Sequence, residues 1–138
     1  ETTSTETTST ETTSTETIST ETTSTETTTS TYNISVSAQS SSNYILSGSD
    51  QNGNVSGNDP SISAKVGDTF SFDVNSPGHP FYLINVSNGG TDSNNLIDGV
   101  SNNGASSGTI SWTPTTAGTY YYICEFHSSM LGTITITE

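Results

Sequence analysis

Most of this chain consists of short runs in which apolar and polar residues alternate, and turn residues separate these runs. Phe70, Phe72 and Val74 fall on one side of an extended backbone, with Ser71 and Asp73 on the other. Gly, Asn, Asp and Ser recur about every 8–12 positions, a spacing typical of a β-sandwich or β-barrel. No window carries the i, i+3, i+4, i+7 apolar pattern of an amphipathic helix. The sequence therefore predicts an all-β domain.

We expect about eight strands, since that many alternating runs are bounded by turn residues. Their ranges are Tyr32–Ala38, Tyr44–Leu46, Ser61–Val66, Thr69–Val74, Pro80–Val86, Gly108–Trp112, Thr119–Cys124 and Gly132–Thr137. Gly67 and Asp68 predict a tight turn between two of them. Residues 88–107 are rich in Asn, Gly and Ser and predict a long loop with a turn of helix near Asn95–Gly99.

Residues 1–30 form a repeat tail that differs from the rest of the chain. Its six pentads read ETTST, ETTST, ETTST, ETIST, ETTST and ETTTS, and Ile18 is their sole hydrophobic residue. Such a segment has no apolar face from which to build a core, and its evenly spaced Glu residues repel one another. We expect a stalk or linker. The alternatives are a densely O-glycosylated stem and an assembly strand whose odd period places successive repeats on opposite faces.

The predicted organisation is therefore a tail at 1–30 and one compact domain at 31–138, which is long enough for a single core. Few charges and many Ser, Thr, Asn and Gly indicate an extracytoplasmic protein that is secreted, periplasmic or surface-attached. Three N-x-S/T sequons begin at Asn33, Asn54 and Asn85 and would accept glycans in a host with the machinery. The single Cys forms no internal disulfide.

Charge excludes several classes of partner. The chain has 14 acidic residues, one Lys and no Arg, for a formal net charge of −13. Lys65 alone cannot neutralise phosphates, so we expect no nucleic-acid partner, and anionic membrane surfaces are disfavoured. No apolar run approaches the roughly 18 residues of a membrane span.

All the soft or borderline metal ligands of the chain fit one site. Cys124, His127 and Met130 follow one another as Cys-x2-His-x2-Met, and His79, upstream, is the only other His of the chain. A thiolate and two imidazoles in a plane, with a weak axial thioether, make a blue-copper electron-transfer site. Four protein ligands leave no open position, so the pattern predicts one-electron transfer rather than an enzyme.

Each of these residues also has a purely structural interpretation. Cys124 would be a small buried hydrophobe, His79 a core or turn residue, and Met130 a core filler. Catalysis has no support, because the sequence offers no second Cys and no Ser-His-Asp or paired-carboxylate arrangement.

Three segments together resemble the cupredoxins. They are GTYYYICEFHSSM at 118–130, GHPF at 78–81 and VGDTF at 66–70. The resemblance covers residues 32–138 and none of the tail; it is to plastocyanin-like proteins, with a short ligand loop closer to that of amicyanin. It implies an eight-stranded Greek-key sandwich that holds one type 1 copper ion. The equatorial ligands would be His79, Cys124 and His127, and the axial ligand Met130.

The resemblance also implies a docking surface for a redox partner protein near His127, the exposed ligand, with Pro80, Phe126 and Leu131 around it. Two positions depart from the family. Pro80 stands where an Asn commonly tethers the Cys loop, and Glu125 beside the thiolate should lower the potential. Because red-copper relatives use a Glu ligand, Glu125 is a minor alternative ligand.

We therefore expect a type 1 copper electron carrier, secreted or surface-attached through its tail. The alternative is a structural subunit of an extracellular fibre, sheath or virion surface. In that case the cupredoxin-like domain is a building block, and self-assembly runs through residues 1–30.

Overall fold

The computed structural model describes residues 26–88 and 90–138, so most of the predicted repeat tail lies outside the described residues. Within these ranges the chain forms nine strands and no helix. The strands are β1 Thr31–Ala38, β2 Tyr44–Asp50, β3 Gly53–Asn58, β4 Ile62–Lys65, β5 Thr69–Asn75, β6 Phe81–Ile84, β7 Ser107–Trp112, β8 Gly118–Cys124 and β9 Leu131–Thr137. No helix in the described part of the chain is long and apolar enough to cross a membrane.

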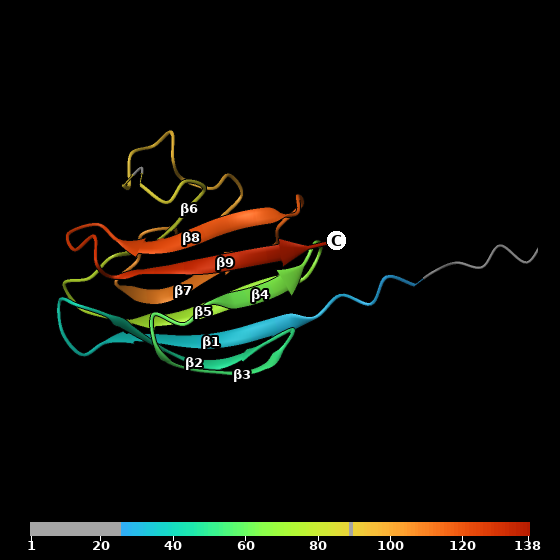
Figure 1. Cartoon of the computed structure of the whole chain (residues 1–138), viewed down its shortest axis with the longest axis horizontal. Helices are drawn as coiled ribbons and strands as arrows, with labels where there is room; N and C mark the ends of the chain where they lie inside the picture. The colour runs from blue at the N-terminus through green and yellow to red at the C-terminus, as the bar shows by residue number, and fades with distance from the viewer. Residues whose placement is uncertain (1–25, 89) are drawn as a thin grey trace, which may run out of the picture.

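The strands form two sheets that pack face to face (Figure 1). One sheet has five strands in the order β3-β2-β1-β5-β7, and the other has four in the order β4-β9-β8-β6. Neighbouring strands are antiparallel except in the pairs β1–β5 and β4–β9. The predicted all-β, Greek-key sandwich is confirmed, with one strand more than the sequence indicated.

The strand that the sequence did not predict is β3, at the edge of the five-stranded sheet. Its residues GNVSGN include one apolar side chain, Val55, so it lacks the alternation that marks a half-buried strand. The predicted helical turn near Asn95–Gly99 is wrong. Leu96 instead forms a β-bridge with Ile84, and the Ile97 N–H donates to the Leu83 carbonyl at 3.2 Å.

The predicted turn at Gly67 and Asp68 is present, and it carries the chain from one sheet to the other rather than closing a hairpin. Gly67 has φ +90°, a conformation that glycine adopts without a steric cost. Asp68 is buried, and its carboxylate accepts from the backbone N–H of Ser30 at 2.8 Å and of Lys65 at 2.9 Å. The turn therefore also fixes the point at which residues 26–30 join the sandwich.

The core lies between the sheets and is made by the inward residues of the alternating runs. Its largest fully buried side chains are Tyr44, Tyr122, Phe70, Phe72, Phe81, Ile34, Leu46, Ile62, Leu83, Ile84, Ile110 and Met130. Aromatic rings meet near the start of β6, where Phe81 lies 5.2 Å from Phe72 and 5.2 Å from Tyr122 between ring centroids. This packing holds β6 and β8 at a fixed spacing beside the end of β8.

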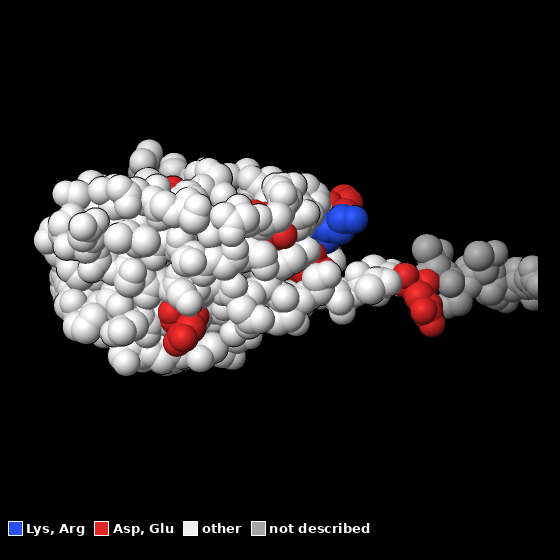
Figure 2. All heavy atoms as spheres, turned by 90° about the horizontal axis from the view of Figure 1, so that it is seen from below, with Lys and Arg blue, Asp and Glu red and all other residues white. Residues whose placement is uncertain are grey.

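The two ends of the sandwich differ. Residues 26–30 and the C-terminus lie at one end, and the β8–β9 loop lies at the other (Figure 1). Hydrogen bonds tie the first end together, because the Thr69 N–H donates to Ser30 and the Val66 N–H to Thr137, both at 2.8 Å. Charged side chains are few and scattered on the face in Figure 2. The β8–β9 loop at the end opposite the tail carries one acidic side chain, the exposed Glu125.

Candidate metal centre

Cys124 is the last residue of β8, and its side chain points into the sandwich. It is 1% exposed and lies on the inward face with Tyr122. Its partner in the neighbouring strand is Phe81, the first residue of β6. The Cys124 N–H donates to the Met130 carbonyl at 3.0 Å, so the loop that follows closes directly onto β9.

The loop from Glu125 to Met130 is held by backbone hydrogen bonds, one within the loop and one to the segment that carries His79. The Met130 N–H donates to the His127 carbonyl at 3.0 Å, and the Glu125 N–H donates to the Pro80 carbonyl at 3.4 Å. His127 is half-buried, whereas Phe126 is 65% exposed. The loop therefore turns one imidazole toward the Cys124 sulfur and leaves an aromatic ring in solvent beside it.

His79 reaches the same place from the segment between β5 and β6. A turn at Ser76-Pro77-Gly78 reverses the chain, with Gly78 at φ +79° and the His79 N–H donating to the Ser76 carbonyl at 2.9 Å. β6 then begins two residues later, at Phe81, which pairs with Cys124. This pairing brings a histidine from 45 residues upstream beside the cysteine.

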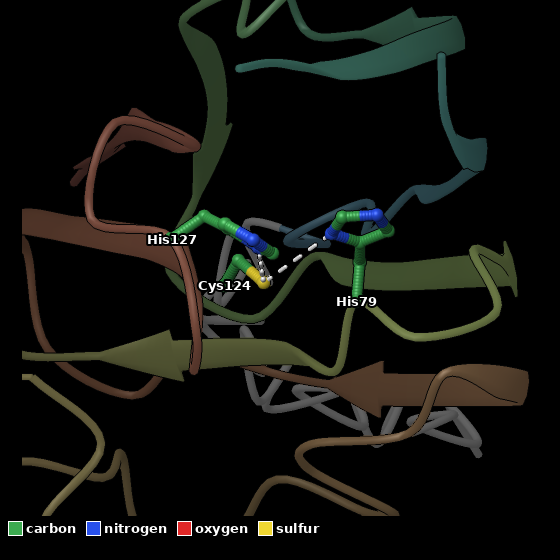
Figure 3. Close-up of side chains that lie close together, drawn as sticks. All are labelled: His79, Cys124 and His127. Atoms are coloured by element: carbon green, nitrogen blue, oxygen red, sulfur yellow. Dashed lines mark hydrogen bonds between the residues drawn. The ribbon is translucent and has the colours of Figure 1, made fainter. Parts of the chain in front are cut away.

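The three side chains converge on one point (Figure 3). The Cys124 Sγ lies 3.8 Å from the His79 Nδ1 and 3.6 Å from the His127 Nδ1, and the ligand atoms all lie within 4.8 Å of one another. Metal bonds of about 2.0 Å to imidazole and 2.3 Å to thiolate, set 120° apart, place N and S about 3.7 Å apart. The group therefore fits one trigonally coordinated ion.

The remaining candidates are placed as follows. Met130 is 0% exposed and belongs to the core cluster, at the point where the loop re-enters β9. The group that can hold a metal contains no carboxylate, and Glu125 is exposed. The structure thus gives no support to the alternative that Glu125 is a ligand, and Met130 as axial ligand remains a prediction.

Sequence reasoning missed one residue of the site, Tyr44. Its hydroxyl donates to the carbonyls of His79 and Pro80, at 3.0 and 2.9 Å. Burial raises the pKa of Tyr44, and the proximity of Cys124 raises it further. No local pattern in the sequence could have revealed this, because Tyr44 lies 35 residues from His79 and reads as an ordinary strand residue.

Comparison with solved structures identifies the architecture. A rusticyanin, described as a copper protein, matches over 78% of each chain with 22% identity and a TM-score of 0.50. A substituted rusticyanin matches over 78% of each chain with 19% identity and a TM-score of 0.51. The domain has the cupredoxin fold.

A purple cupredoxin from Nitrosopumilus maritimus also matches, with 20% identity over 56% of this chain and 77% of its own, and a TM-score of 0.41. No family model matches the sequence, and no curated protein is detectably similar to it. Within the cupredoxin fold of this chain, the His79, Cys124 and His127 group fits a type 1 site, in which two His and one Cys form the plane.

Proposed function

We propose that this chain is a type 1 copper protein that transfers single electrons and is not an enzyme. The observation that carries the proposal is the approach of both Nδ1 atoms to the one Cys124 sulfur, at 3.8 and 3.6 Å. A neutral imidazole pair and a thiolate suit copper, and Met130 is the candidate axial thioether. A bound copper ion would supply a one-electron Cu(II)/Cu(I) couple.

The chain's own part in this function is to keep the ligands fixed and dry. Cys124 is buried, and the hydrogen bonds of the Glu125–Met130 loop restrict movement of His127. When the ligands barely move between the two oxidation states, the reorganisation energy of electron transfer is small. Because four side chains would fill the coordination shell, no position remains for a substrate.

We infer that electrons pass at the end of the sandwich where His127 lies. His127 is half-buried, Phe126 is 65% exposed beside it, and Pro80 and Leu131 are half-buried neighbours. A small apolar surface of this kind suits a transient complex with a redox partner protein.

We infer further that the protein works outside the cytoplasm and is tethered through residues 1–30. Residues 26–30 leave the sandwich at the end opposite the β8–β9 loop (Figure 1), so a tether would present His127 outward. The alternative that the tail drives self-assembly into a fibre or sheath makes a different prediction. Sedimentation of the full chain would then depend on concentration, and that of a chain beginning at Glu26 would not.

The proposal is tested by titrating the metal-free protein with Cu(II). We expect one equivalent to bind and an intense thiolate-to-copper absorption band near ~600 nm. Cys124→Ser should abolish the band, whereas Ser128→Ala, an exposed change in the same loop, should keep it. Absence of the band from folded wild-type protein at saturating copper would refute a type 1 site.

A further inference from the structure

Tyr44 lies in β2 of the five-stranded sheet, yet its hydroxyl contacts the segment that carries His79 into the other sheet. The phenol oxygen lies 3.0 Å from the His79 carbonyl oxygen and 2.9 Å from the Pro80 carbonyl oxygen. Since a phenol has one proton, the two carbonyls share it in a three-centre hydrogen bond. The side chain is 0% exposed, so water does not compete for these acceptors.

The peptide bond between His79 and Pro80 has few other contacts that fix its direction. Pro80 has no backbone N–H, so the His79–Pro80 peptide cannot donate a hydrogen bond. The His79 carbonyl instead accepts from the Ser76 hydroxyl at 2.9 Å and from Tyr44 at 3.0 Å. Both lone pairs of this oxygen are thereby used, and the direction of the peptide is fixed.

The second carbonyl joins the two ligand segments. The Pro80 oxygen accepts from the Tyr44 hydroxyl and also from the N–H of Glu125, the residue directly after Cys124. The Tyr44 hydroxyl and the Glu125 N–H thus share one acceptor, which ties the segment of His79 to that of Cys124.

Tyr44 is itself held firmly, so it can impose a position on its neighbours. The Tyr44 N–H donates to the Asp59 carboxylate at 2.8 Å, and the Asp59 N–H donates to the Tyr44 carbonyl, also at 2.8 Å. Its ring lies edge-on to Phe81, with the centroids 5.0 Å apart. Backbone and ring contacts therefore fix the hydroxyl from both ends of the residue.

We propose that Tyr44 is the positioning residue of the metal centre, whose hydroxyl fixes the His79–Pro80 peptide and thereby the His79 imidazole relative to the Cys124 sulfur. This rests on the proposed function, because it assigns Tyr44 to the same site. Partners that orient a ligating histidine typically change metal affinity about 10- to 100-fold when they are lost.

The test compares Tyr44→Phe with Tyr122→Phe in the full chain. Tyr122 is a matched control, since it is also 0% exposed and loses one hydroxyl, which donates to the Pro60 carbonyl at 2.7 Å. In the metal-free proteins, we expect amide hydrogen exchange at His79 and Glu125 to rise about tenfold in Tyr44→Phe. The amide of Lys65, at the other end of the sandwich, should not change relative to wild type beyond any global loss of stability.

With Cu(II) bound, Tyr44→Phe should bind about tenfold more weakly and show altered relative intensities of the thiolate-to-copper bands, and Tyr122→Phe should match wild type. Ser76→Ala, which removes the other donor to the His79 carbonyl, should act in the same direction as Tyr44→Phe. The proposal is overturned if Tyr44→Phe accelerates exchange equally at Lys65 and Glu125, or if its spectrum and affinity equal those of Tyr122→Phe. Failure of wild type to bind copper would instead refute the proposed function, and the metal-free exchange rates would still decide whether Tyr44 positions His79.

Discussion

The ring of Tyr122 lies over Gly132 and fills the space that a Cβ at position 132 would occupy. The two residues are directly opposite each other in the β8–β9 pair. Tyr122 is 0% exposed, and its hydroxyl donates to the Pro60 carbonyl, so the ring has nowhere to move. Because β8 ends at Cys124 and β9 follows Met130, this contact helps to set the spacing of the strands that flank the ligand loop.

Gly132→Ala should therefore destabilise the protein. The added methyl group overlaps the Tyr122 ring, and overpacking of this kind costs about 2 kcal/mol in the free energy of unfolding. Chemical denaturation measures the loss. In a Tyr122→Leu background the same substitution should cost less than half as much. An equal cost in both backgrounds would show that the ring is not the cause.

Met130→Leu tests the axial position without emptying the core. Met130 is 0% exposed, and a Met-to-Leu change nearly conserves volume, so we expect a loss of less than about 1.5 kcal/mol in stability. Removing a weak sulfur donor disfavours Cu(II) relative to Cu(I), so the reduction potential should rise while the intense band near ~600 nm remains. Voltammetry gives the potential. Ile62→Leu, a buried change in β4, is the control and should leave the potential unaltered.

The sequence indicates the candidate ligands because three of the four lie close together along the chain. Cys124, His127 and Met130 lie in one short segment, and two of the hydrogen bonds that shape it, Cys124 N–H to Met130 and Met130 N–H to His127, stay within that segment. His79 becomes a candidate because the chain has a single other histidine, within the GHPF segment at 78–81. Its approach to Cys124 depends on the pairing of β6 with β8, which no periodicity encodes.

The features that sequence reasoning missed depend on contacts between distant segments. Tyr44 reaches His79 from the opposite sheet, and β3 is held at an edge by backbone pairing with β2 rather than by an apolar face. Leu96 pairs with Ile84 across the long loop, which is why the expected helical turn does not form. Alternation predicts which residues face inward; it does not say which strands meet or which side chain reaches across the core.

Phe126→Glu should slow electron exchange between copies of the protein. Phe126 is 65% exposed and lies beside His127, where two molecules would approach each other, so two added negative charges would face one another. At low ionic strength we expect the self-exchange rate to be about tenfold lower than in wild type. NMR line broadening in mixtures of Cu(I) and Cu(II) protein measures this rate.

Thr115→Glu provides the matched control for this charge. Thr115 is exposed and follows Pro114, whose carbonyl accepts from the Gly67 N–H at the end where the tail joins. Thr115→Glu adds the same charge far from His127, so the self-exchange rate of this variant should stay close to that of wild type. Equal slowing by the two substitutions would place the exchange surface elsewhere, or show that net charge alone controls the rate.

Asp59 should make stability fall as the pH rises. Burial raises the pKa of Asp59 from its ordinary value of 3.8, and the hydrogen bond from the Tyr44 N–H offsets this only in part. The folded protein then binds more protons than the unfolded chain, so the free energy of unfolding decreases as pH rises from about 3.8 through the higher folded pKa. Asp59→Asn keeps an acceptor for the Tyr44 N–H and does not titrate. As the pH rises from about 3.5 to 7, urea denaturation should therefore show its free energy of unfolding increasing relative to that of wild type. The increase should exceed that of Asp92→Asn, an exposed control, and a constant difference between Asp59→Asn and wild type would contradict this.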